Sequence, residues 1–208
     1  MKKSLLFLLL FLLISYGFRE NTSYAGEENS WQGEISFENI NPVEASKKYC
    51  SQADKILRYF NAIPNKTKAD EQKYLNAAKY FYYQAERADK SNTDALVGKA
   101  RIALYENHIR DAKNALSIAL NINEDNPKVN YYLGETFFKD GEFAKAVDFY
   151  LHAYTHGYRY NFWTNYKLGV AYEKLDAPER ARIHYTNAVK ANPNSKAAAA
   201  RLAGLDMI

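Results

Sequence analysis

Cysteine is almost absent from this chain of 208 residues, since Cys50 is the single one. An intramolecular disulfide is therefore excluded, and the fold cannot depend on a disulfide framework. We expect Cys50 to be a small apolar residue on the inner face of the first helix. A disulfide to another molecule is the alternative.

A strong charge of one sign is also lacking. The formal net charge is +4, and it falls to +2 without residues 1–25, which carry three basic side chains and one acidic one. Proteins that bind nucleic acid usually show a basic patch or stripe. We therefore expect no nucleic-acid partner.

Motifs for catalysis are missing as well. The chain has no glycine-rich phosphate loop, no nucleophile elbow and no zincin motif. We expect no enzyme activity and no cofactor.

One pattern has the spacing of metal ligands. Asp148, His152 and His156 follow one another at intervals of four residues, so they share one face of a helix. The same residues suit a solvated outer surface, which is our interpretation, and we expect no metal site. A weak metal site at these three residues is the alternative.

A long apolar run occurs at the amino terminus. A basic start, Lys2 and Lys3, is followed by unbroken apolar sequence from Leu5 to Ile14. This order is typical of a secretory signal peptide, and we expect one over 1–25, with cleavage after Ala25 or, alternatively, after Gly17. The run is shorter than the roughly 20 apolar residues of a transmembrane helix, although an uncleaved anchor is an alternative. The sequence thus predicts export to the periplasm or the extracellular space, with membrane contact only if this segment is retained.

An alanine returns at nearly constant intervals along the rest of the chain. Ala78, Ala112, Ala146 and Ala181 lie 34, 34 and 35 residues apart. Two further columns keep the same step: Tyr82, Leu116, Tyr150 and Tyr185, then Ala85, Ala119, Ala153 and Ala188. The columns lie four and three residues apart, so they share one helix face, where alanine lets two helices approach closely. One helix pair cannot bury such a face alone, so the period predicts a stack of helix pairs.

The residues around these columns carry a family resemblance. Two successive stretches share one pattern: Leu133-Gly134, Phe137, Ala146, Tyr150 and Ala153, then Leu168-Gly169, Tyr172, Ala181, Tyr185 and Ala188. This pattern resembles the tetratricopeptide repeat (TPR), over roughly 42–205. In the earlier unit Gly98 lies two residues out of register. The resemblance implies an all-α, right-handed helix-turn-helix solenoid of about four TPR-like units with a C-terminal capping helix.

We expect three segments: the signal peptide at 1–25, a polar linker at 26–41, and the solenoid at 42–208. The linker is either a tether or a strap that docks on the solenoid. The expected helices are 43–63, 70–89, 93–106, 109–122, 127–139, 143–156, 162–174, 178–190 and 195–205. Asn-Pro pairs at 126–127 and 192–193 predict a helix break or a helix start, and the pair at 41–42 predicts the start of the first helix. The spacing from Asp176 to Glu179 resembles a capping box, which also predicts a helix start. Asp140-Gly141 predicts a turn.

In the TPR family the first helices of the pairs line a concave groove that binds extended peptides. By register, the resemblance implies these groove residues: Lys128, Tyr131, Glu135, Phe138, Lys139, Trp163, Tyr166, Val170, Glu173 and Lys174. It also implies a set that defines the repeats structurally: Ala78, Ala85, Gly98, Ala112, Ala119, Gly134, Ala146, Ala153, Gly169, Ala181 and Ala188. We expect an exported scaffold that binds a protein or peptide partner, with aromatic rings as anchors and envelope assembly as a candidate setting.

Three alternatives remain open at this point. Several of the aromatic rings could instead fill space between helix pairs. Because aromatic residues make up 15% of the chain, binding of cell-wall glycan on exposed rings is a second function class. A homodimer through the end helices is a further alternative.

Overall fold

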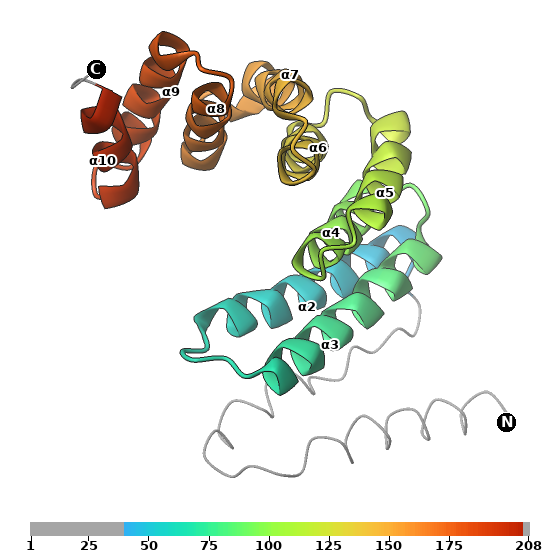
Figure 1. The fold of residues 1–208 in the computed structure, drawn as a ribbon. Helices are drawn as coiled ribbons and strands as arrows, with labels where there is room; N and C mark the ends of the chain where they lie inside the picture. Colours follow the sequence, from blue (N-terminus) through green and yellow to red (C-terminus); the bar gives the residue numbers. More distant parts are fainter. Residues whose placement is uncertain (1–39, 206–208) are drawn as a thin grey trace, which may run out of the picture. The chain divides into compact units, whose positions relative to one another are not determined.

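The computed structural model describes residues 40–205, which belong to one compact unit. These residues form helices and turns without any strand, so the expected all-α fold is confirmed (Figure 1). The helices are α2 (Pro42–Ala62), α3 (Lys68–Ala88), α4 (Thr93–Tyr105), α5 (Ile109–Ile122), α6 (Pro127–Lys139), α7 (Phe143–Ala153), the π-helical turn η2 (Tyr154–Tyr158), α8 (Phe162–Lys174), α9 (Pro178–Ala191) and α10 (Lys196–Leu205). None of these helices is long and apolar enough to cross a membrane. The predicted signal peptide and nearly all of the predicted linker lie outside the described residues.

Asparagine side chains begin several of the helices. The Asn41 side chain accepts a hydrogen bond from the backbone N–H of Glu44, and the Asn126 side chain accepts from two N–H groups of the first turn of α6. Pro42 and Pro127 follow in the first helical turn, where proline costs no hydrogen bond. The two predicted Asn-Pro starts are thus confirmed, and both helices begin within one residue of the predicted position.

Of the two roles predicted for Asn192-Pro193, the structure shows the helix break and not the helix start. Asn192 ends α9, and its side chain accepts from the N–H of Asn194 in the following turn. Helix α10 begins at Lys196, where the hydroxyl of Ser195 accepts from the N–H of Ala198. The Asn-Pro pair here closes one helix instead of opening the next.

The predicted capping box at Asp176 is wrong. Asp176 has a φ of 53°, and Ala177 donates its N–H back to the carbonyl of Tyr172 in α8. Asp176 therefore belongs to the end of α8, in a Schellman-type turn that leaves it in the left-handed region. Asn107 and Gly141 occupy the same position in the two preceding units, with φ of 61° and 81°. The left-handed residue is thus a repeating feature of the turn within each pair, including the predicted turn at Asp140-Gly141.

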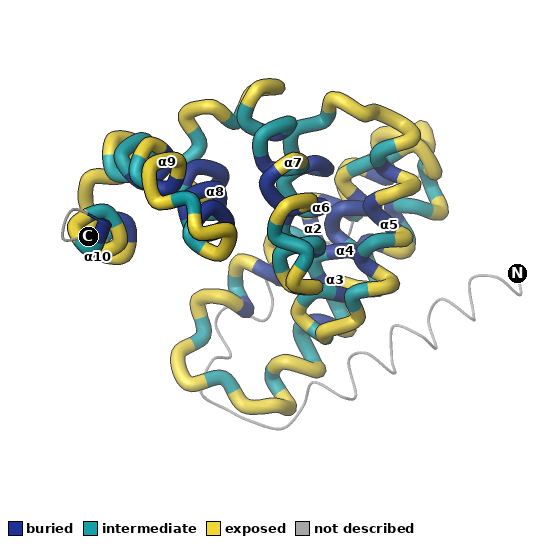
Figure 2. Tube along the Cα trace, turned by 45° about the horizontal axis from the view of Figure 1, so that its top comes forward, coloured by how far each residue is buried: buried dark blue, intermediate teal, exposed yellow. Residues whose placement is uncertain are grey.

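Each helix packs against the next one in the chain, both within a pair and between successive pairs. The repeated alanines lie at these contacts: Ala78, Ala85, Ala112, Ala119, Ala146, Ala153, Ala181 and Ala188 are all 0% exposed. Figure 2 shows buried positions along the sides of the helices that face one another. Small side chains there allow the close approach that the period of the sequence implies.

Glycine and tyrosine face each other inside two of the pairs. A Cβ on Gly134 would lie 2.5 Å from the ring of Tyr150, and a Cβ on Gly169 would lie 2.5 Å from the ring of Tyr185. A Cβ on Gly98 would also meet a ring, but that of Tyr82 in the preceding pair, at 2.2 Å. Gly98 is therefore not the register equivalent of Gly134, which explains its offset of two residues.

Cys50 lies buried on α2 as a free thiol. Burial raises the pKa of the Cys50 thiol to about 12, so the group stays protonated at neutral pH. The residue thus packs as a small apolar side chain, as predicted.

Candidate partner-binding surface

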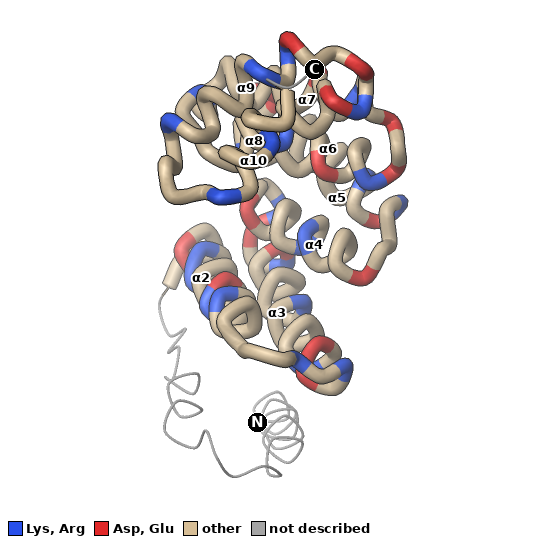
Figure 3. The backbone as a smooth tube through the Cα atoms, turned by 60° about the vertical axis from the view of Figure 1, so that its left-hand side comes forward, with Lys and Arg blue, Asp and Glu red and all other residues tan. Residues whose placement is uncertain are grey.

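The predicted groove residues lie on α6 and α8, the first helices of two successive pairs. We call the surface formed by α2, α4, α6, α8 and α10 the first-helix face. Acidic and basic residues are interspersed on the described helices (Figure 3). On the first-helix face, these charges are arranged in pairs that connect one helix to the next.

Four ion pairs link successive first helices. They are Asp54–Arg101 from α2 to α4 at 3.0 Å, Asp94–Lys128 from α4 to α6 at 2.7 Å, Glu135–Lys167 from α6 to α8 at 2.7 Å, and Glu173–Arg201 from α8 to α10 at 2.8 Å. We call this set the charge ladder. Three of the predicted partner contacts, Lys128, Glu135 and Glu173, are therefore already engaged within the chain.

Tyrosine hydroxyls donate hydrogen bonds to three carboxylates of the charge ladder. Tyr82 donates to Asp54 at 2.6 Å, Tyr185 donates to Glu173 at 2.7 Å, and Tyr150 donates to Glu135. Burial, with the adjacent carboxylate, raises the pKa of each of these tyrosines well above its ordinary value. The hydroxyls thus remain donors at physiological pH. The three tyrosines of this repeat column therefore fill the core and also orient the carboxylates of the charge ladder.

Lys167→Met tests whether the charge ladder stabilises the fold. The substitution keeps the apolar stem of the side chain but removes the charge that pairs with Glu135, and both side chains are mostly buried. We expect the free energy of unfolding to fall by about 1 kcal/mol, and by less at high salt, because salt screens such pairs. Urea unfolding at two salt concentrations measures the change. The control is Lys145→Met, whose pair with Glu142 lies within one turn, and a larger loss in the control would contradict the bracing role.

The predicted aromatic contacts differ in exposure. Tyr131 packs against Tyr150 with ring centroids 5.7 Å apart, and Tyr166 packs against Tyr185 at 5.8 Å. Phe138 and Val170 also pack against the core of the last two pairs. Trp163 is different, because it is 57% exposed at the start of α8. Most of these side chains therefore help to fill space between helices, and among the predicted aromatic contacts Trp163 is the ring with more than half of its surface exposed.

The two predicted lysines lie at the carboxyl ends of α6 and α8, whereas Trp163 lies at the start of α8. Lys139 and Lys174 are exposed at the ends of α6 and α8, and Lys139 donates to the carbonyl of Leu104. Tyr160, which precedes α8, is 85% exposed and was missed by the register argument, because it lies in the loop after η2. The sequence signal that could have found it is the aromatic cluster at 158–163.

A polar hollow of about 250 Å³ lies at the α2 end of the ladder. Its lining residues carry both signs of charge and the buried thiol: Lys47, Cys50, Ser51, Asp54, Arg58, Asn92 and Asp94. Sequence reasoning missed this hollow, since the first unit matches the repeat pattern only in its second helix. The hollow adds polar groups to the surface that the ladder braces.

Comparison with known proteins agrees with this geometry. A family model described as a tetratricopeptide repeat matches residues 164–195, which fall on α8 and α9. Among curated proteins, none matches the sequence. The structure described as "Functional Characterization of Pseudomonas Aeruginosa pilF" is 20% identical over 79% of this chain and 68% of that chain, with a TM-score of 0.68.

Two further similar structures have peptide binding in their descriptions. One is YrrB, "a TPR protein with an unusual peptide-binding site", at 16% identity over 76% of this chain and 75% of that chain, with a TM-score of 0.56. The other is the first TPR of Spaghetti (RPAP3) bound to an HSP90 peptide, at 18% identity over 55% of this chain and 93% of that chain, with a TM-score of 0.52. The chain thus carries one matched tetratricopeptide repeat, at residues 164–195, and shares a TPR-like helical solenoid fold with these structures.

Proposed function

We propose that this protein is an exported scaffold that binds a peptide segment or a partner helix on its first-helix face, in the assembly of a bacterial envelope. Proteins of the TPR fold are typically scaffolds without enzyme activity that mediate protein–protein interaction. The basic start and apolar run of residues 1–14 support export through a signal peptide, to the periplasm or the extracellular space.

The observation that carries the binding proposal is an exposed tryptophan beside a braced surface. Trp163 is 57% exposed, and its ring packs edge-on against Phe162 with centroids 4.9 Å apart. A large ring held by its neighbours binds at a low entropic cost, and tryptophan is enriched among residues that dominate binding energy. The ladder fixes the helices around this ring, so a partner meets a preorganised surface.

Trp163→Ala tests the proposal. A photo-crosslinking residue at position 163, in cells that express the protein, is expected to form a discrete protein adduct, which identifies the partner by mass. With that partner purified, Trp163→Ala is expected to weaken binding about tenfold or more, the loss typical of a hot-spot residue. The matched control is Ile183, an exposed apolar residue on α9, the second helix of the same pair.

The control position is expected to give no adduct and Ile183→Ala no change in affinity. Equal loss from both variants would contradict a site on the first-helix face. Binding to isolated glycan strands without any protein adduct would favour the glycan alternative instead.

The proposed export is tested separately, by the mass of the mature protein. This mass is expected to fit a chain that begins at Gly26, and a full-length mass would mean that the amino-terminal segment is retained.

A further inference from the structure

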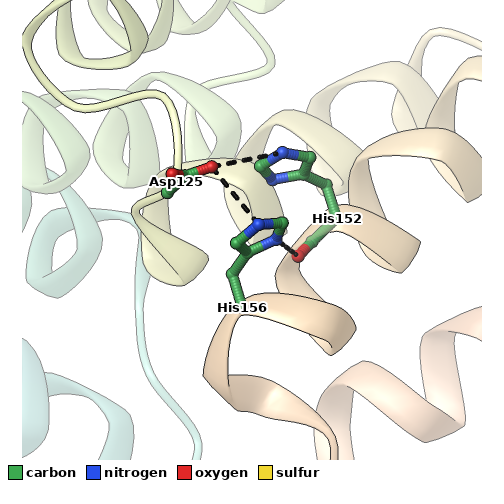
Figure 4. Close-up of side chains that lie close together, drawn as sticks. All are labelled: Asp125, His152 and His156. Carbon is green, nitrogen blue, oxygen red and sulfur yellow. Dashed lines mark hydrogen bonds and ion pairs between the residues drawn. The ribbon is translucent and has the colours of Figure 1, made fainter.

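Three side chains that can bind metal converge where the turn between α5 and α6 passes the end of α7 (Figure 4). The Oδ1 atom of Asp125 lies 3.3 Å from Nε2 of His156 and 3.6 Å from Nε2 of His152. The ligating atoms of all three residues lie within 4.8 Å of one another. Asp148, which the sequence spacing grouped with the histidines, is not a member of this cluster. Asp125 takes its place from 27 positions before His152, so the helical spacing alone could not reveal it.

The local backbone aims both histidines at Asp125. They lie four residues apart, and their rings stack with centroids 4.0 Å apart. The Nδ1 atom of His156 lies 2.8 Å from the carbonyl oxygen of His152. Because a carbonyl only accepts, this Nδ1 carries the proton, and Nε2 is the ring nitrogen that faces the carboxylate. Hydrogen bonds of this kind orient the histidines of metal sites.

The arrangement places electron-rich atoms against one another. A neutral Nε2 and a carboxylate oxygen repel at 3.3 Å unless a proton or a cation lies between them. The buried Nδ1 atom of His152 has no hydrogen-bond partner among the described residues, so no hydrogen bond at Nδ1 fixes the tautomer of that ring. The Nε2 atom of His152 is the nitrogen that faces Asp125, at 3.6 Å from its Oδ1 atom.

Zinc fits the donor set and the spacing. Two imidazole nitrogens and one carboxylate oxygen suit zinc, whereas calcium and magnesium prefer oxygen ligands alone. With zinc–ligand bonds of about 2.0–2.2 Å, the ligands of a tetrahedral site lie about 3.3–3.5 Å apart, which the two separations from Asp125 approach. The rings need only turn from their parallel stack for both lone pairs to meet one ion. Water would complete the coordination, since Asp125 is exposed.

We propose that Asp125, His152 and His156 bind one zinc ion, which ties the turn between α5 and α6 to the end of α7. The ion would link two successive repeats through these three residues. This proposal is independent of the proposed partner binding.

The test is zinc titration of the untagged full chain against a chromophoric chelator, together with thermal unfolding. We expect one zinc per chain and a rise in the midpoint of unfolding of about 5–10 °C at zinc concentrations near 100 times the dissociation constant. Magnesium at the same concentration is expected to cause no shift. Asp125→Asn and His156→Asn are each expected to weaken zinc binding at least tenfold.

Two matched controls keep the test decisive. Asp148→Asn changes the other carboxylate near the pair, and His108→Asn changes an exposed histidine on a different turn, so both are expected to bind zinc normally. Because Asp125 is exposed, its variant is expected to keep the fold, which far-UV circular dichroism checks. Absence of stoichiometric zinc in the unmodified chain, or unchanged binding in both ligand variants, would overturn the proposal and leave Asp125 as a simple ion-pair partner of the histidines.

Discussion

Gly134→Ala is expected to lower the free energy of unfolding by about 1–3 kcal/mol, although it adds a single methyl group. The new Cβ would lie 2.5 Å from the ring of Tyr150, far inside van der Waals contact. The ring is fully buried, and its hydroxyl is held by Glu135, so it has no free space to move into. The strain therefore falls on the packing between α6 and α7.

The same contact predicts a compensating change. Tyr150→Leu alone is expected to cost about 2–4 kcal/mol, since it leaves a cavity and removes a hydrogen bond. The double variant is expected to cost less than the two single changes together, by about 1 kcal/mol or more. The chain already contains this combination one repeat earlier, where Ala100 and Leu116 occupy the corresponding positions and lie buried in one core cluster.

Urea unfolding of the four proteins measures this coupling. Gly204→Ala is the matched control, because a Cβ there meets nothing within 4 Å and alanine favours a helix more than glycine does. The control is expected to retain or raise stability. Strictly additive costs for Gly134→Ala and Tyr150→Leu would show that the glycine and the ring do not share the space that the structure assigns to them.

The alanine period was enough to predict most of the fold. A column that packs one helix against another must recur with each pair, so Ala78 to Ala181 fixed the order of the helices and placed most boundaries within two residues. The capping box predicted at Asp176 was wrong because this residue type is compatible with two local structures. Asp176 can cap a helix or end one, and the hydrogen bonds back to α8 decide the outcome. The outcome depends on the hydrogen bonds that the turn makes in the folded chain, and the sequence of the turn alone does not predict them.

The surface was harder to predict than the core. Register placed Glu135 and Glu173 on the first-helix face, but it could not show that Lys167 and Arg201 reach them from the next helix. Those pairs depend on the distance between successive first helices, which the packing of the second helices sets. For the same reason Asp125 was missed, since the turn that carries it approaches His156 only once two repeats are stacked.

Stability is expected to fall by about 3 kcal/mol between pH 6.5 and pH 4 because of His184 alone. The ring is 9% exposed and lies between Tyr154 and Tyr172, each with centroids 5.6 Å away. The Nδ2 atom of Asn165 donates to the carbonyls of Arg159 and Asn161, so its Oδ1 faces Nδ1 of His184 at 3.3 Å. The neutral ring therefore donates one hydrogen bond, while a charged ring would have to carry its charge in a dry site.

Burial lowers the pKa of His184 from 6.5 to about 4 in the folded chain. Between these two values the unfolded chain takes up a proton that the folded chain refuses, so acid favours unfolding. The contribution is complete above pH 6.5, shrinks as the pH falls, and is fully lost below about pH 4. Basic pH has no effect through this group.

Chemical unfolding of the unmodified chain and of His184→Gln over this range isolates the effect. Glutamine keeps a hydrogen-bond donor for Asn165 but does not titrate, so the variant is expected to lose less stability than the parent from pH 6.5 to pH 4. Carboxylates that titrate near pH 4 contribute equally to both proteins, and His108→Gln, at an exposed position, is expected to follow the parent curve. Parallel curves for the parent and His184→Gln would mean that the folded chain accepts the proton as readily as the unfolded chain, which a ring enclosed by two tyrosines should not do.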